Sequence, residues 1–140
     1  MSQASTYIRQ LPELTDDNRT FWTAGEFGEL RISRCPDCGQ YTHPPSPICP
    51  GCLGRSVVPS RVSGRGRVVA YTVNRHAFVP GMPVPFIVVL VEIAEQEGTW
   101  IFSEMRHCAP ERIRIGLPVR VGFEHIEDVW LPCFEPEDAI

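Results

Sequence analysis

Two pairs of cysteines constrain the fold of this chain more than any other feature. Cys35 and Cys38 form one pair and Cys49 and Cys52 the other, with two residues inside each pair and ten residues between the pairs. Because zinc binds four thiolates in a tetrahedron, two short turns that face each other can supply all the ligands of one ion. The spacing therefore predicts a zinc ribbon, in which these four cysteines hold a structural Zn²⁺ ion.

Other interpretations of the cysteine pairs remain open. Two disulfides or two redox-active dithiols are the alternatives, but a redox pair usually occurs once, beside a βαβ unit, and here two pairs lie in a proline-rich segment. His43 lies between the pairs and could replace one cysteine as a ligand. We expect Gly39 and Gly51 to take the positive φ that such turns tend to need. A site closed by four cysteines has no open position, so we expect no catalysis at the metal.

Composition indicates an ordinary globular protein and excludes some chemistry. The 140 residues, of which 43% are hydrophobic and 21% charged, suffice for one domain or for a small module beside a compact one. All 13 basic residues are arginine, so the chain cannot itself form a lysine Schiff base. The net charge of −4 argues against binding to duplex nucleic acid, because such binding depends on neutralising phosphates.

The sequence also bears on cellular location. The longest apolar run covers residues 86–91, which is far too short to span a bilayer. No basic start followed by an apolar segment occurs at the N-terminus, so we expect no signal peptide. Thiolates that hold zinc suit a reducing compartment, and we therefore expect a cytoplasmic protein without membrane contact.

A short helix is predicted near the N-terminus, after an extended arm over residues 1–14. Thr15 can cap a helix whose first residues are acidic, which suits the positive end of the helix dipole. Phe21 and Trp22 would form its apolar face, and Gly25 or Gly28 would end it. So short a helix needs a surface to pack on, either in this chain or on a partner.

The remaining pattern is β-rich. The predicted strands cover residues 30–34, 68–73, 86–93, 99–103, 119–123 and 129–134, with one helical turn at 109–113. Five strands after the ribbon, with a short helix before the fourth, suit a small closed barrel of the OB type, and a five-stranded sandwich is the alternative. The predicted fold class is therefore mainly β: an N-terminal arm and helix (1–29), a zinc ribbon (30–60) and an OB-fold barrel (61–140).

Taken in order, these segments resemble one family. The motifs that carry the resemblance are Phe21-Trp22, Cys35-Pro-Asp-Cys38-Gly39, Pro44-Pro45, Cys49-Pro-Gly-Cys52, Gly66-Arg-Val-Val-Ala-Tyr-Thr-Val73, Pro85-Phe86, Ile115-Gly-Leu-Pro-Val119 and Leu131-Pro-Cys-Phe134. Their order, from about residue 21 to 136, is similar to that of acyl-CoA-associated proteins that join a rubredoxin-like zinc ribbon to an OB fold. Members include the small subunit of benzoylsuccinyl-CoA thiolase and the OB-fold partner of a steroid side-chain aldolase.

The resemblance implies an accessory subunit rather than a complete enzyme. In that family a thiolase-like partner carries the reactive residues, so we expect a hetero-oligomer in which this chain helps to form the acyl-CoA site and supplies no catalytic residue. Contacts to CoA phosphates, or to an acidic partner surface, are predicted for Arg65, Arg67, Arg75 and His76, because arginine binds phosphate in a bidentate manner. The alternative for these residues is a set of solvated charges on a strand face and loop.

Two other functions are considered. A single-stranded nucleic-acid-binding module is the alternative, since zinc ribbons and OB folds both occur in that role, although the acidic chain disfavours it. A stand-alone zinc enzyme is disfavoured by the closed metal site. Cys108 and Cys133 lie outside the pairs, and we expect both to be unreactive core thiols rather than nucleophiles.

Overall fold

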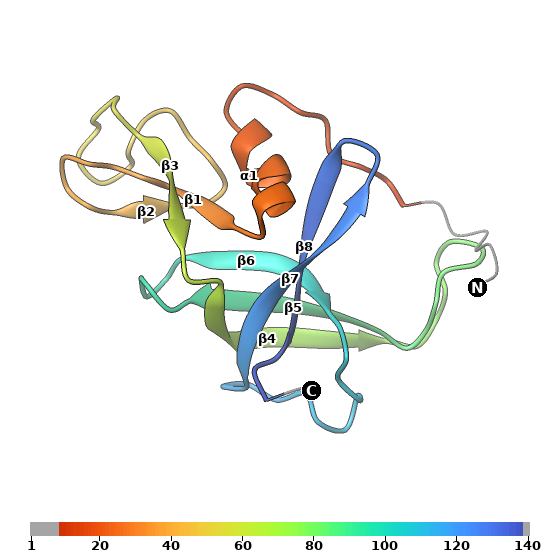
Figure 1. Ribbon diagram of the computed structural model, residues 1–140. Helices are drawn as coiled ribbons and strands as arrows, with labels where there is room; N and C mark the ends of the chain where they lie inside the picture. Colours follow the sequence, from red (N-terminus) through yellow and green to blue (C-terminus); the bar gives the residue numbers. More distant parts are fainter. Residues whose placement is uncertain (1–8, 139–140) are drawn as a thin grey trace.

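A closed five-stranded barrel forms the C-terminal part of the molecule. The computed structural model describes residues 9–138 (Figure 1). The barrel strands are β4 (Arg65–Asn74), β5 (Phe86–Ile93), β6 (Trp100–Met105), β7 (Pro118–Ile126) and β8 (Val129–Pro136). They close in the order β4-β5-β6-β8-β7, and only β6 and β8 run parallel. This is the topology of an OB fold and not of a sandwich, so the predicted fold class is confirmed.

Alternating side chains on β5 fill part of the barrel interior. Ile87, Val89 and Val91 point inward and are buried, whereas the residues between them are only half-buried on the outer surface. β4 and β5 extend past the barrel and join through a hairpin loop, residues 75–85, that projects on the right of Figure 1. A register shift between Val68 and Ala70 marks a bulge in β4, a feature that bends strands in small barrels.

A three-stranded sheet precedes the barrel. Its strands are β1 (Leu30–Arg34), β2 (Tyr41–Thr42) and β3 (Val58–Val62), in the order β2-β1-β3. The predicted strand 30–34 is confirmed, but β3 was not predicted. β3 pairs with the whole of β1, from Leu30 opposite Val62 to Arg34 opposite Val58, and it runs past residue 60. The division at residues 60 and 61 stays a prediction.

Gln96, in the turn between β5 and β6, joins the ribbon to the barrel. Its side-chain oxygen accepts a hydrogen bond from the Tyr41 N–H at 2.8 Å, and its side-chain nitrogen donates to the Tyr41 carbonyl at 2.9 Å. The same nitrogen lies 2.6 Å from the Thr99 hydroxyl. One side chain therefore satisfies both backbone groups of Tyr41, as a neighbouring strand would.

The N-terminal helix begins later than predicted. Thr15 and Asn18 exchange side-chain-to-backbone hydrogen bonds of 2.7 and 3.2 Å in a turn, and α1 covers only Arg19–Thr23. A 3₁₀ segment, η1 (Ala24–Phe27), continues it. Of the two glycines predicted to end the helix, Gly28 does so, with a φ of 71°.

Two further predictions concern the segment 109–113 and the N-terminal arm. At 109–113, where one helical turn was predicted, a single turn occurs, closed by a 2.8 Å hydrogen bond from the Arg112 N–H to the Ala109 carbonyl, and it does not extend into a helix. Part of the predicted arm, residues 1–8, lies outside the described residues. Within 9–138 no helix is long and apolar enough to cross a membrane.

Candidate functional site

The four cysteines converge on one point, as the spacing predicted. Their sulfur atoms all lie within 4.8 Å of one another, and the Cys35–Cys52 and Cys38–Cys49 pairs are 3.5 and 3.6 Å apart. Four sulfurs bound to zinc at 2.3 Å have edges of about 3.8 Å. The cluster therefore has the size and donor set of a tetrahedral zinc site.

Backbone hydrogen bonds build the two cysteine turns in the same way. The Gly39 N–H donates to the Cys35 carbonyl at 2.7 Å, and the Leu53 N–H donates to the Cys49 carbonyl at 2.8 Å. The residue after each second cysteine is left-handed, with φ of 80° at Gly39 and 63° at Leu53. The expectation for Gly39 is confirmed. The one for Gly51 is wrong, because the left-handed position in the second turn belongs to Leu53.

The thiol pKa values reflect the crowding of the sulfurs. Backbone N–H groups, that of Cys52 first, lower the pKa of Cys49 to about 7. The Gly54 N–H lowers the pKa of Cys52, but the neighbouring sulfurs and burial outweigh it and raise this pKa to about 12. Ionisation of one thiol therefore makes ionisation of a second thiol less favourable, and a bound cation would offset this repulsion between thiolates. The donor set fits Zn²⁺ on this ground too.

His43 is not a fifth member of this cluster. Among the described residues, the metal-binding group comprises the four cysteines alone. His43 instead packs its ring 4.7 Å from that of Phe21, and burial lowers its pKa to about 4. Its Nδ1 is buried without a partner among the described residues. The imidazole is therefore neutral at physiological pH and forms part of a groove wall.

That groove is the second feature of the site and was not predicted. It has a volume of about 1010 Å³ and lies between the arm, α1, the ribbon loop and the outer surface of β5 and β6. Phe21, Trp22 and His43 line one side, and Trp100 and Phe102 line the other. The sequence signal for this groove was the alternation in residues 99–103, whose outward positions are aromatic.

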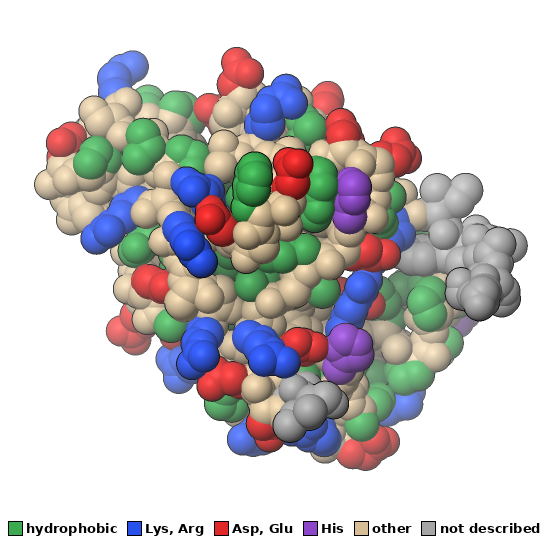
Figure 2. Space-filling view, viewed as in Figure 1, with side chains coloured by type: hydrophobic (Ala, Val, Ile, Leu, Met, Phe, Trp, Pro, Cys, Tyr) green, Lys and Arg blue, Asp and Glu red, His purple; other side chains and the backbone are tan. Residues whose placement is uncertain are grey.

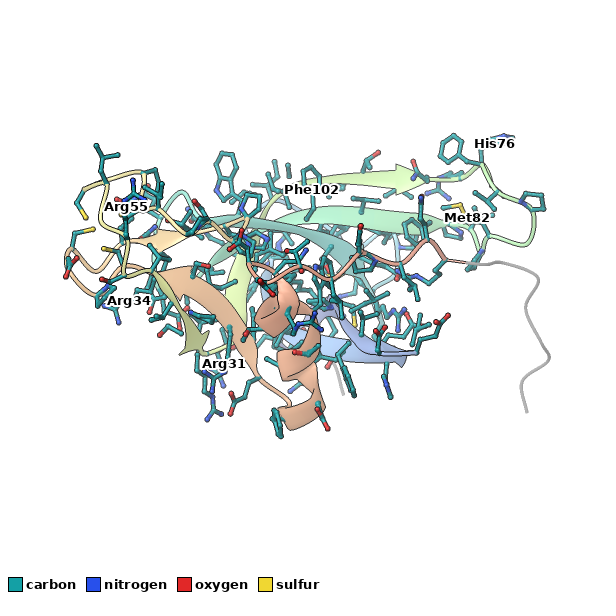
Figure 3. All side chains as sticks on the ribbon, turned by 90° about the horizontal axis from the view of Figure 1, so that it is seen from above. Arg31, Arg34, Arg55, His76, Met82 and Phe102 are labelled. Carbon is teal, nitrogen blue, oxygen red and sulfur yellow. The ribbon has the colours of Figure 1, made fainter. Side chains whose placement is uncertain are left out.

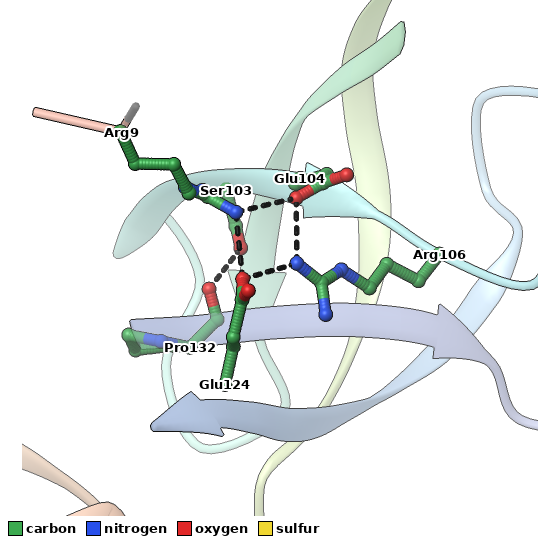
Figure 4. Close-up of polar contacts among 6 residues, drawn as sticks. All are labelled: Arg9, Ser103, Glu104, Arg106, Glu124 and Pro132. Atoms are coloured by element: carbon green, nitrogen blue, oxygen red, sulfur yellow. Dashed lines mark hydrogen bonds and ion pairs between the residues drawn. The ribbon is translucent and has the colours of Figure 1, made fainter. Parts of the chain in front are cut away.

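A cluster of four charged side chains attaches the arm beside this groove (Figure 4). Arg9 on the arm contacts Glu104 at 3.3 Å and Glu124 at 2.7 Å. Arg106 contacts the same two carboxylates, Glu104 at 3.2 Å and Glu124 more closely. Each carboxylate therefore has two cationic neighbours, and one of them comes from outside the barrel.

The predicted CoA or partner contacts fall in two separate places. Arg65 and Arg67 lie at one end of β4, where Arg65 is 3.8 Å from Glu137 and Arg67 is 2.8 Å from Glu92. Arg75 and His76 lie beyond the other end of that strand, about 26 Å away at 3.3 Å per residue. The structure does not bring the four into one site. Figure 2 likewise shows arginine and acidic side chains interspersed over the barrel.

Cys108 and Cys133 have the character of unreactive thiols. Burial is the largest cause of the raised pKa at both positions. Among the described residues the Cys108 thiol lies 3.5 Å from the Ala109 carbonyl, and the His107 ring contacts Glu135, at 2.7 Å, rather than this thiol. A raised pKa keeps both thiols protonated and poorly nucleophilic.

Comparisons with known families divide the chain as the two β modules do. Residues 22–58 match the family described as "ChsH2, rubredoxin-like zinc ribbon domain". Residues 60–124 match the family described as "ChsH2, C-terminal OB-fold domain". The first match covers most of the three-stranded sheet, and the second covers the barrel up to β7 and ends before β8.

Several curated proteins are similar in sequence. The "3-oxo-4,17-pregnadiene-20-carboxyl-CoA hydratase alpha subunit" of Mycobacterium tuberculosis is 37% identical over 91% of this chain. The "Probable enoyl-CoA hydratase alpha subunit" of Thermomonospora curvata is 34% identical over 92% of this chain. The chain spans only 40% of the length of each of these two relatives. A "DUF35 domain-containing scaffold protein" of Methanocaldococcus jannaschii is 30% identical, over 68% of this chain and 67% of the relative.

Solved structures show the same arrangement. A chain of the "Ltp2-ChsH2(DUF35) aldolase" superposes with a TM-score of 0.80 at 33% identity, and the match covers 90% of this chain and 98% of that one. A DUF35 protein from Sulfolobus solfataricus has a TM-score of 0.62 at 14% identity, which shows the shared fold alone.

Proposed function

This chain belongs to the family of zinc-ribbon and OB-fold proteins that contains ChsH2 and the DUF35 scaffold proteins, and on that premise we propose that it is a partner subunit of a thiolase-like enzyme. In this role it binds the enzyme subunit and helps to form its acyl-CoA site for C–C bond cleavage or acyl transfer. The observation that carries the proposal is the match to the aldolase chain. Nearly the whole of that chain is covered, and it comes from an assembly named for two components.

The chemistry of the described residues supports a role without catalysis. Four thiolates would hold zinc with no open position for water or substrate, so the ion would order the ribbon and not activate a nucleophile. The two remaining thiols have raised pKa values, which disfavours nucleophilic attack by either. The reacting groups are therefore expected on the partner.

The outer surface of the barrel disfavours the alternative of single-stranded nucleic-acid binding. An OB fold used in that way combines exposed aromatic residues with a positively charged groove. Here Trp100 places its indole nitrogen 3.4 Å from the Glu92 carboxylate, and Phe102 lies two residues from Glu104. These carboxylates pair with arginines, so the aromatic side chains do not line a positively charged groove of the kind that binds a phosphate backbone.

Co-purification tests the proposal. The tagged chain would be co-expressed with the thiolase-like protein encoded nearest to it and, separately, with Ltp2. Complex formation would be measured by size-exclusion chromatography with light scattering. Acyl-CoA binding would then be compared by calorimetry, with acetyl-CoA as the probe, for the chain alone, the partner alone and the complex.

The expected result is a stable complex that binds acyl-CoA more tightly than either component does. A monomeric chain that ignores both partners and acetyl-CoA would contradict the proposal. A salt-sensitive complex with single-stranded DNA, measured by fluorescence polarisation, would favour the alternative instead.

A further inference from the structure

Apolar side chains lie on the outside of the barrel, on β5 and β6, and on the projecting hairpin. We propose that this surface, here called the outer strip, is where the enzyme subunit docks. The outer strip consists of Phe86, Val88 and Leu90 on β5, Trp100 and Phe102 on β6, and Phe78, Val79 and Val84 in the hairpin. The inference rests on the proposed function and adds the place of contact to it.

Strand register puts these residues on one face. Leu90 lies opposite Phe102, and Phe86 and Val88 share its side of β5, because every second residue of a strand points the same way. The interior positions between them are buried, so the outward residues are not needed to fill the core. In Figure 3 Phe102 projects from the sheet, and the hairpin with His76 and Met82 continues at the right-hand end.

The exposed aromatic area is comparable to the largest apolar patch of a typical monomer, which is often a functional surface. Phe102 is 76% exposed, Phe78 is 68% exposed and Trp100 is 49% exposed. At roughly 200 Å² for an aromatic side chain, these three alone present about 400 Å². A standard interface buries about 800 Å² on each partner, so the outer strip supplies much of one interface. Other exposed apolar side chains, such as Leu53 and Ile115, lie outside it.

The backbone of the hairpin is restrained, which keeps the apolar side chains at its tip exposed. Pro80, Pro83 and Pro85 restrict its backbone, and the Met82 N–H donates to the Val79 carbonyl at 3.0 Å in a turn. His76 stands edge-on to Phe78, with ring centroids 5.6 Å apart. A preorganised apolar tip loses little entropy when it binds.

Charge indicates what the outer strip binds. Residues 38–91, which include the hairpin and all of the strip on β5, contain five arginines and no acidic residue, in a chain whose net charge is −4. Arg75 at the base of the hairpin makes no ion pair among residues 9–138. The carboxylates on the two strands of the strip are already engaged: Glu92 on β5 contacts Arg67, and Glu104 on β6 contacts Arg9 and Arg106. A second copy that docked through the same two strands would therefore offer Arg75 no unengaged carboxylate from β5 or β6. The fitting partner is a different protein, with an apolar surface bordered by a carboxylate.

Two matched phenylalanines provide the test. Phe102 lies in the outer strip, and Phe27, in η1, is equally exposed at 74% but lies outside it. The variants Phe102→Asp and Phe27→Asp would be titrated with Ltp2 as the probe, by biolayer interferometry. Their melting temperatures would be measured alongside, and exposure predicts that both fold as the wild type does. Phe78→Asp serves as a second strip variant.

The outcomes are distinct. We expect Phe102→Asp and Phe78→Asp each to weaken the complex by about 30-fold or more, as at an interface hot spot, and Phe27→Asp to weaken it less than about 3-fold. If the wild type binds Ltp2 and both strip variants bind equally well, the outer strip is not the docking site, while the proposed function stands. If the wild type does not bind Ltp2, the proposed function itself is weakened. A wild-type homodimer that Phe102→Asp dissolves would assign the strip to a second copy and overturn the proposal.

Discussion

Gly25 lies where η1 meets the hairpin of β7 and β8, and its replacement by alanine is expected to separate these elements. A Cβ at this position would lie 2.5 Å from the Cβ of Trp130 and 2.6 Å from Cδ1 of Phe123. Relaxed carbon contacts are about 3.5 Å or longer, so η1 would have to move by about 1 Å. The Trp130 Cβ is fixed to the backbone and cannot rotate away. Overpacking of this kind costs about 2–3 kcal/mol of unfolding free energy.

Gly28 provides the matched control, because it is needed for its conformation and not for space. Its φ is 71°, yet nothing lies within 4 Å of a Cβ built there. Gly28→Ala is therefore expected to cost only about 1 kcal/mol of left-handed strain. Unfolding in guanidinium chloride gives both values. Since Trp130 lies at the contact, its fluorescence should shift to the red in Gly25→Ala alone. A Gly25→Ala variant within about 0.5 kcal/mol of the wild type, or less destabilised than Gly28→Ala, would refute the packing argument.

Three further predictions concern the metal, the charged cluster and pH. The chain should bind about one Zn²⁺, and Cys49→Ser should lose tight binding and the order of the ribbon, as measured by a chelator-release assay and near-UV circular dichroism. Arg106→Gln should lower the unfolding free energy by about 1 kcal/mol, whereas Arg9→Gln should cost less and mainly speed proteolysis of the arm; equal costs would contradict this difference. The Gly98 N–H, followed by Arg67, lowers the pKa of Glu92 from its ordinary 4.5. Its contribution to stability is therefore full above pH 4.5 and lost as pH falls below that value, so wild type and Glu92→Gln should converge in acid. Zinc release affects both proteins equally and cancels in the difference.

The sequence predicted best the features that have a local physical cause. The cysteine spacing specifies the metal ligands because two short turns suffice to aim four sulfurs at one point. Strand β5 was predicted over its observed range, Phe86–Ile93, because most of its residues are β-branched. These features depend on neighbours in the sequence and on little else.

Features that depend on a distant partner were missed. β3 contains Pro59 and Ser60 and is a strand because β1 pairs with its full length. Leu53 takes a left-handed conformation because the second cysteine turn repeats the backbone of the first, although leucine has no preference for it. The sequence also did not reveal that β4 separates Arg65 and Arg67 from Arg75 and His76; contacts of these residues to CoA or to a partner stay a prediction. Trp100 and Phe102 could be assigned to the outside only once the register with β5 was known.

The metal centre affects the groove indirectly, through the clamp between Gln96 and Tyr41. A closed zinc site would fix the ribbon turns, and β2 follows directly from the first of them. Gln96 then holds Tyr41 at both its N–H and its carbonyl, so the ribbon and the β5–β6 turn share one rigid contact. His43 follows Tyr41 by two residues and lines the same groove as Trp100 and Phe102. Zinc would thus order one wall of the groove without contacting the groove itself, which is consistent with the accessory role proposed above.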